Sequence, residues 1–162
     1  MQILNNFLDK KKFQEIKDLI FSDSFPFYFN DSIVGKNVDQ GKDFMFNHMF
    51  YSDDQQRSNH FNYVLMPILG RLNFNHLLRA KLNCYTKKNK FIHTPFHTDS
   101  ESPHTVALFS LNTCNGYTYF KDTKEKIQSV ENQVVIFNGL REHCSVAQTD
   151  THLRVNININ LI

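Results

Sequence analysis

The sequence contains no tryptophan, only five glycines and only four prolines in 162 residues. It therefore has no Pro/Gly/Ser-rich stretch that could serve as a linker, and no internal repeat or low-complexity tract divides it. We expect a single domain over residues 1–162. A chain of this length buries roughly two thirds of the surface that it exposes when unfolded.

Cysteine is also scarce, with Cys84, Cys114 and Cys144 widely spaced along the chain. This spacing forms neither a disulfide framework nor a CxxC zinc motif, and the odd count favours free thiols in a reducing compartment. No stretch approaches the length of a membrane span, and the first residues lack the continuous apolar segment of a signal peptide. These absences predict a cytoplasmic protein without a membrane partner.

The chain also lacks a strong excess of charge, with a formal net charge of +2. Gripping a nucleic acid requires several clustered cations, so the composition argues against such a partner. The basic clusters are Lys10, Lys11 and Lys12, and Lys87, Lys88 and Lys90. Short basic runs of this kind more commonly form solvated turns and helix faces than binding sites.

Helical patterns are confined to residues 1–78, which we expect to form a supporting region of helices and a strand. Apolar residues recur at helical spacing after Asp9, which predicts a helix over residues 10–21 with Asp9 as its N-cap. A second helix is predicted from Ser58 to about residue 72, with Pro67 either kinking it or starting a new one. Between them, residues 43–51 alternate with period two and predict a strand.

Residues 79–162 have almost only strand patterns, with turn signals at Asn115-Gly116 and Asn138-Gly139. At least seven short strands preceded by helices predict a mainly β protein. We expect a double-stranded β-helix, or cupin-like jelly roll, with helices packed on one outer face. The predicted strands are residues 79–85, 104–112, 117–120, 125–130, 133–139, 143–148 and 153–162.

Two histidines and one carboxylate in this half have the composition of a metal site. His97 and Asp99 stand two residues apart, so an extended segment points both side chains to the same side. His143 follows several strands later, where a jelly roll can return the chain to the same end of the barrel. Two imidazoles and one carboxylate can bind Fe(II) on one face and leave open positions for other ligands.

The last predicted strand separates an aliphatic face from a polar face. The polar face either lies in solvent or forms a polar barrel interior while the aliphatic face packs on the helices. We favour the interior for Arg154 and Asn156, because asparagine is a poor choice for an exposed strand, and leave Asn158 and Asn160 open. The planar fork of Arg154 could clamp a carboxylate in bidentate fashion. The aliphatic residues are Val155, Ile157, Ile159 and Leu161.

The order His97-x-Asp99, then His143, then Arg154 resembles the 2-oxoglutarate/Fe(II)-dependent oxygenase superfamily, especially its prolyl-hydroxylase-like members. Tyr85 matches a tyrosine in the strand before the metal motif of that family. The resemblance implies Fe(II) at His97, Asp99 and His143, with 2-oxoglutarate as co-substrate, O2, and ascorbate as the reductant. It also implies that Arg154 and Tyr85 hold the distal carboxylate of 2-oxoglutarate.

Other positions carry the same resemblance. Residues 115–120 are similar to the family's Gly-Gly-x-Thr-x-Phe motif, and Phe137 matches the aromatic residue of the strand before the second histidine. By position, Thr118 or Tyr119 would line the pocket. Ser110 falls where some prolyl hydroxylases use a second tyrosine, so that contact is expected to be lost or supplied by another group.

The chain also resembles the alkylated-nucleic-acid demethylases of this superfamily. Asn83-Cys84-Tyr85 is similar to their Asn-x-Tyr, and Arg154-Val155-Asn156 to their Arg-x-Asn, which adds Asn83 and Asn156 to the co-substrate residues. However, Asn160 stands where those enzymes have an arginine. Short oxygenases of marine phages and their hosts are similar as well.

These patterns predict a dioxygenase that hydroxylates a peptidyl or small polar substrate and releases succinate and CO2. Asp99 argues against halogenation, because halogenating relatives leave the carboxylate position free for chloride. The alternatives are a nucleic-acid demethylase, a non-catalytic cupin-like module that binds metal or sugar, and a phage structural or assembly protein. We expect residues 86–96 to form a mobile rim over the iron; the oligomeric state is left open.

Overall fold

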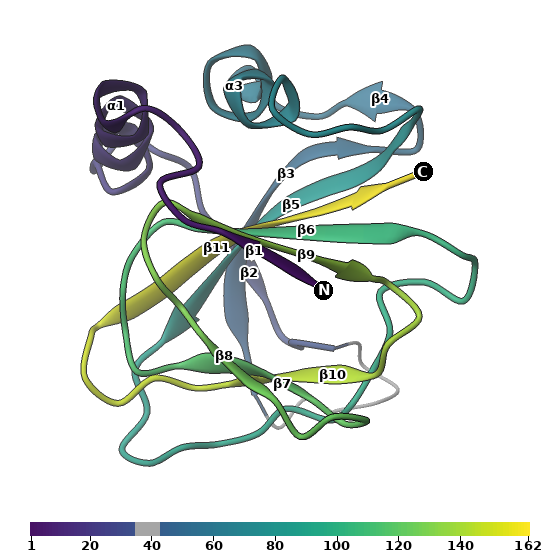
Figure 1. Cartoon of the computed structure of the whole chain (residues 1–162). Coiled ribbons are helices and arrows are strands. Elements are labelled where there is room, and N and C mark those ends of the chain that lie inside the picture. The colour runs from purple at the N-terminus through teal and green to yellow at the C-terminus, as the bar shows by residue number, and fades with distance from the viewer. Residues whose placement is uncertain (35–42) are drawn as a thin grey trace.

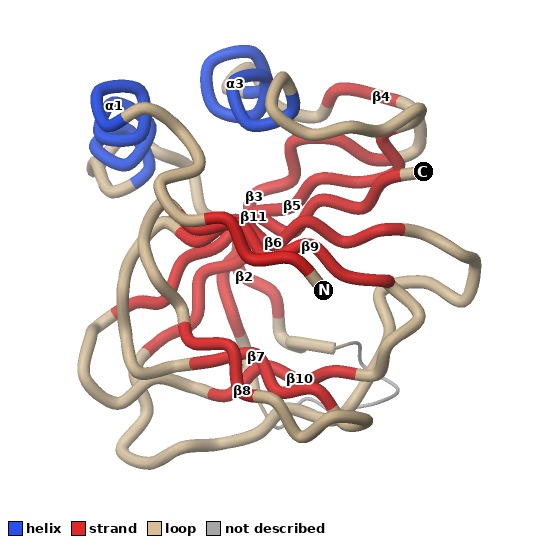
Figure 2. The backbone as a smooth tube through the Cα atoms, viewed as in Figure 1, coloured by secondary structure: helices blue, strands red, loops and turns tan. Residues whose placement is uncertain are grey.

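The computed structural model describes residues 1–34 and 43–162, which form two antiparallel sheets and a helical layer (Figures 1 and 2). The large sheet has the order β1-β9-β6-β11-β5-β3-β2, with β4 paired to β3, and the small sheet has the order β10-β7-β8. The strands are β1 (Gln2–Leu4), β2 (Tyr28–Asn30), β3 (Met45–Ser52), β4 (Gln55–Gln56), β5 (Leu77–Thr86), β6 (Thr105–Ser110), β7 (Tyr117–Phe120), β8 (Lys126–Gln128), β9 (Gln133–Asn138), β10 (His143–Val146) and β11 (Leu153–Leu161).

Helices α1 (Lys10–Ile20) and α3 (Met66–Leu69) cover one face of the large sheet, while the small sheet lies across its other face (Figure 1). This is the predicted double-stranded β-helix with helices on one outer face. The strands of the N-terminal half extend the large sheet, because β1 pairs with β9 and β3 pairs with β5. No helix in the described part of the chain is long and apolar enough to cross a membrane.

Strand β11 lies inside the large sheet, between β5 and β6. Its aliphatic residues are fully buried in the main hydrophobic core, together with residues of α1 and α3. The opposite face is buried as well: Arg154, Asn156, Asn158 and Asn160 are only 2, 2, 8 and 3% exposed. The polar face is therefore a barrel interior, and the alternative of solvent-exposed asparagines is wrong.

Helix α1 confirms the pattern read from the sequence. The Asp9 carboxylate accepts a hydrogen bond from the backbone N–H of Lys12 at 2.9 Å, as an N-cap does. The buried residues Phe13, Ile16 and Ile20 recur at helical spacing and face the sheet. The Phe13 ring meets that of Phe109 edge-on, with ring centroids 6.2 Å apart.

The second predicted helix differs from its prediction in form and in length. It consists of a π-helical segment, η1 (Phe61–Leu65), followed by α3, and it ends before Gly70. Pro67 lies in the first turn of α3, where its missing N–H costs nothing, so it starts a new segment. Ser58 is not the N-cap of η1, because its hydroxyl pairs with His48 Nε2 at 2.7 Å and accepts from the His60 N–H.

The two predicted Asn-Gly turns do not close hairpins. Strand β6 lies in the large sheet and β7 in the small sheet, so Gly116 stands where the chain crosses between sheets. A Cβ added to Gly116 would lie 3.0 Å from Cδ of Arg154. At Gly139 a Cβ would lie 2.0 Å from Nε2 of His104. Each glycine therefore lets a side chain lie close to the backbone: Arg154 at Gly116 and His104 at Gly139.

The three cysteines are free and buried, as their spacing predicted. Burial raises the pKa of the Cys84 and Cys144 thiols to about 11. Neither thiol is therefore activated as a nucleophile.

Asn132 ties the N-terminal segment to the barrel. Its side-chain amide accepts from the Leu8 N–H and donates to the Leu8 carbonyl, each at 2.9 Å, although its φ is +54°. We expect Asn132→Ala to destabilise the protein by about 2 to 4 kcal/mol, because two buried backbone groups lose their partners. Asn132→Gly should be more stable than the alanine variant by about 1 kcal/mol, since glycine tolerates positive φ. Urea denaturation measures both, and equal stability of wild type and Asn132→Gly would contradict a role for the amide.

Candidate metal and anion site

His97 and His143 are neighbours across an antiparallel bridge, although they are far apart in the sequence. Each backbone N–H donates to the carbonyl of the other at 3.0 Å. Because directly paired residues point to the same face, both imidazoles enter the barrel together, with ring centroids 4.8 Å apart. His143 is the first residue of β10, and His97 precedes the crossing to β6.

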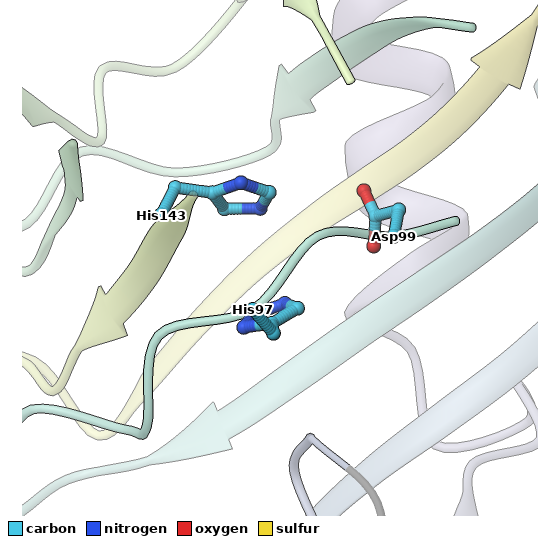
Figure 3. Close-up of side chains that lie close together, drawn as sticks. All are labelled: His97, Asp99 and His143. Atoms are coloured by element: carbon cyan, nitrogen blue, oxygen red, sulfur yellow. The ribbon is translucent and has the colours of Figure 1, made fainter. Parts of the chain in front are cut away.

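Asp99 completes a cluster with these two histidines (Figure 3). One donor atom from each of the three residues lies within 4.8 Å of the other two. The structure thus brings together the three residues that the sequence nominated as metal ligands.

The two imidazoles are held in the form that a metal requires. Nδ1 of His143 lies 2.9 Å from the Arg141 carbonyl, and Nδ1 of His97 lies 3.3 Å from the Pro95 carbonyl. Nδ1 therefore carries the proton and Nε2 keeps its lone pair. Burial, with a contribution from His143, lowers the pKa of His97 and favours the neutral ring.

The Asp99 carboxylate is held in its ionised form by two neighbours. Burial alone would raise its pKa, but a hydrogen bond from Asn158 and the charge of Arg79 outweigh burial and hold the pKa below its usual value. Asn158 Nδ2 lies 2.9 Å from one carboxylate oxygen, and an Arg79 nitrogen lies 3.1 Å from the other. Two imidazoles and one ionised carboxylate form a suitable donor set for Fe(II) or a related divalent metal.

A cavity of about 120 Å³ opens beside this cluster, between the inner faces of β5, β11 and the small sheet. Since one water needs at least about 10 to 15 Å³ on this measure, the cavity has room for a small organic acid. The four residues predicted to bind the co-substrate all line it: Tyr85, Asn83, Arg154 and Asn156. In the sheet register Arg154 faces Tyr85, and Asn156 faces Asn83.

Arg154 is the largest fully buried side chain among the described residues, and its partners there are uncharged. Its guanidinium donates to Ser145 Oγ at 2.8 Å, to Thr118 Oγ1 at 3.2 Å and to the Tyr117 carbonyl at 3.3 Å. Its Nε has no hydrogen-bond partner in the part of the chain that the structure describes. Because a buried charge without a counter-charge is costly, this site is built to receive an anion.

Tyr85 and the asparagines add neutral polar groups beside Arg154. Burial raises the pKa of Tyr85, so its phenol stays protonated and can donate a hydrogen bond. Asn83 Nδ2 donates to Asn156 Oδ1 at 3.3 Å, and Asn83 Oδ1 accepts no hydrogen bond from residues 1–34 or 43–162. These groups can orient the carboxylate that Arg154 attracts.

The positions whose place in the pocket the sequence left open have three different outcomes. Thr118 and Asn158 line the cavity. Ser110 lines a smaller neighbouring cavity behind Arg154. Asn160 is buried but does not line the main cavity, and Tyr119 faces away from it toward the rings of His93 and Phe96.

Sequence reasoning missed Arg79 and Lys81, which line the same cavity. The signal was present, because β5 alternates and places both residues on the face that carries Asn83 and Tyr85. Burial, with a smaller contribution from the Arg79 charge, lowers the pKa of Lys81 to about 8.

The segment expected to form a mobile rim, residues 86–96, is anchored along its length. Backbone N–H groups of Lys87, Lys88 and Thr94 donate to the carbonyls of His152, Gln148 and Ser145. Lys88 forms an ion pair with Asp43 at 2.6 Å. Its mobility remains a prediction, and the contacts supply no reason to treat it as a free lid.

No protein-family model and no curated protein matches the sequence. Solved structures do match. A prolyl hydroxylase from Trichoplax adhaerens, in complex with a peptide fragment of a hypoxia inducible factor oxygen degradation domain, aligns with a TM-score of 0.66 and 15% identity over 99% of this chain and 82% of its own. A 2OG-Fe(II) oxygenase family protein from Burkholderia pseudomallei aligns with a TM-score of 0.70 and 12% identity over 98% of this chain and 83% of its own.

A viral collagen prolyl hydroxylase from Paramecium bursaria Chlorella virus-1, solved as its 2OG complex, aligns with a TM-score of 0.61 and 11% identity over 99% of this chain and 96% of its own. At these identities the similarity establishes the fold. The chain has the double-stranded β-helix of the prolyl hydroxylases and 2-oxoglutarate oxygenases.

The hydrogen bond from Asn158 to Asp99 generates a prediction about metal affinity. We expect Asn158→Ala to weaken Mn(II) binding about 10- to 100-fold, because an unsupported carboxylate is less well oriented. Asp99→Ala should reduce the affinity further, whereas the exposed His152→Ala should bind like wild type. Calorimetry on metal-free protein measures all three, and an unchanged affinity in Asp99→Ala would show that the metal binds elsewhere.

Proposed function

We propose that this protein is a 2-oxoglutarate- and Fe(II)-dependent dioxygenase that hydroxylates a peptidyl or small polar substrate and releases succinate and CO2. The observation that carries this proposal is one cavity that contains both a His-Asp-His cluster and a buried arginine for which the described residues offer no counter-charge. The fold shared with prolyl hydroxylases and 2-oxoglutarate oxygenases supports it.

The residues present fit the metal and the co-substrate. His97, Asp99 and His143 would hold Fe(II), which when bound supplies the oxygen-activating chemistry of this enzyme class. Arg154 and Tyr85 would hold the distal carboxylate of 2-oxoglutarate, since a buried guanidinium and a protonated phenol both donate hydrogen bonds. Asn83 and Asn156 lie on the next rung of the sheet, between this carboxylate site and the metal site.

The chain's own residues orient the reactants and exclude water. Asn158 and Arg79 keep Asp99 ionised and fixed in direction. Ser145 and Thr118 hold the Arg154 fork in place before the co-substrate arrives, which reduces the ordering cost of binding. The barrel interior buries the carboxylate site, so its electrostatic attraction is stronger than at a surface. Ascorbate would serve as the external reductant that keeps iron ferrous.

A nucleic-acid demethylase is the second candidate, and one structural observation bears on it. Arg79 faces Asn160 in the β5–β11 register and donates to Asp99. A guanidinium is therefore present beside Asn160, the position at which the demethylases have an arginine. The small net charge of +2 still favours a peptidyl or small polar substrate. A non-catalytic cupin-like module would have no need for a buried Arg154 that lacks a counter-charge among the described residues.

Turnover decides between these functions. Succinate release from 2-oxoglutarate is measured with Fe(II), ascorbate and O2, alone and with proline-containing peptides, free amino acids or a methylated oligonucleotide. We expect wild type to release succinate and Asp99→Ala to release none, with His152→Ala as the matched control. Absence of succinate from metal-loaded wild type would refute the enzyme. Stimulation by the oligonucleotide alone would favour the demethylase.

Arg154 generates a separate prediction about co-substrate affinity. Arg154→Ala should weaken 2-oxoglutarate binding by about 2 to 5 kcal/mol while Mn(II) binding changes little, because the variant removes one side of a desolvated charge pair. Arg154→Lys should recover only part of the loss, since an ammonium cannot reproduce the planar fork. Calorimetry under argon measures both, with Arg71→Ala as an exposed arginine control. Equal 2-oxoglutarate affinity in wild type and Arg154→Ala would show that the carboxylate binds elsewhere.

A further inference from the structure

Lys81 is a cavity residue to which the proposed reaction assigns no role. It lies on β5 between Arg79 and Asn83, and it faces Asn158 of β11 in the sheet register. Its partly buried side chain lines the same cavity as the His-Asp-His cluster. Within residues 1–34 and 43–162 its ammonium group makes no hydrogen bond and no ion pair, whereas Arg79 pairs with Asp99.

The charges around the cavity are unbalanced. Three cationic side chains line it, namely Arg79, Lys81 and Arg154, while Asp99 is the one carboxylate among its described lining residues. Arg79 and Asp99 neutralise each other, which leaves two cations without a counter-charge. A bound divalent metal would add to this excess. One distal carboxylate at Arg154 therefore leaves Lys81 still unpaired.

Lys81 belongs to the metal end of the cavity rather than to the Arg154 end. Its charge acts on both His97 and Asp99, and it faces the residue that holds the Asp99 carboxylate. Tyr85 and Arg154 form a rung two positions beyond that of Asn83 and Asn156. Keeping an ammonium group in a partly desolvated cavity is costly unless an anion offsets its charge.

We propose that Lys81 is a second carboxylate-binding group, which holds an organic carboxylate beside the His-Asp-His cluster. This inference rests on the proposed function, in which Arg154 holds the distal carboxylate of 2-oxoglutarate. The carboxylate belongs either to the primary substrate or to the second carboxylate of the co-substrate. If it belongs to the substrate, the substrate carries a free carboxylate: it is a small organic acid such as a free amino acid, or a peptide that presents an aspartate, a glutamate or its C-terminus.

A metal-free binding experiment tests the carboxylate site directly. Succinate, glutarate and adipate are titrated by calorimetry into metal-free protein, each beside the monoamide in which one carboxylate is replaced. We expect at least one dicarboxylate to bind about tenfold or more tightly than its monoamide, because a charge-assisted hydrogen bond is lost with the amide. Lys81→Met should abolish this preference and Lys81→Arg should retain it. Lys87→Met removes an exposed lysine of the same chain region and should behave like wild type.

A second arm identifies the source of the carboxylate. 2-Oxoglutarate is titrated into the Mn(II)-loaded proteins under argon. Affinity weakened about tenfold in Lys81→Met would assign the carboxylate to the co-substrate. Unchanged affinity, together with a lost dicarboxylate preference, would assign it to the primary substrate.

The proposal is overturned if Lys81→Met, folded by circular dichroism, keeps the dicarboxylate preference of wild type, or if wild type has none. Failure of the proposed function is a separate result. In that case metal-loaded wild type would release no succinate, while the calorimetric preference and its loss in Lys81→Met would still be observed.

Discussion

The central position of β11 in the large sheet is the constraint on which the rest of the structure depends. Hydrogen bonds to β5 on one side and β6 on the other fix its register, so its two faces cannot exchange roles. One face carries the aliphatic residues that bury the helices against the sheet. The other is then obliged to place Arg154 and three asparagines inside the barrel.

Burying polar groups inside a barrel costs free energy unless they find hydrogen-bond partners. Which of these groups have partners defines the site. The Asn158 amide supports Asp99, and Asn83 donates to Asn156, but several buried acceptors and Nε of Arg154 have no hydrogen-bond partner among the described residues. Buried polar groups are normally satisfied, so such a concentration indicates a ligand site rather than a packing error. Arg154 supplies one positive charge to this site and is held in place by hydrogen bonds. Lys81 supplies a second positive charge, which no described residue neutralises.

Much of this architecture could be predicted because it depends on local patterns. Asp9 capped α1 as its position indicated, and the period-two alternation of residues 153–162 correctly separated the core face from the interior face. Other features depended on partners distant in the chain. Ser58 was assigned as a helix cap, but its hydroxyl pairs with His48, and the two Asn-Gly pairs provide close approach to Arg154 and His104 instead of hairpin turns.

The sequence by itself determined the residue types and their alternation: two histidines, one carboxylate and one arginine, spaced so that strands could present them on one side. Alternation is a property of the backbone, so it can be recognised without knowing the fold. Only the tertiary structure decided which strands and segments pair with each other. The bridge between His97 and His143, the support of Asp99 by Asn158 and Arg79, and the exposure of Lys81 to the same cavity all follow from pairing between distant segments. The alternation of a strand decides which of its faces is buried, whereas the choice of its partner strand depends on the packing of the whole barrel.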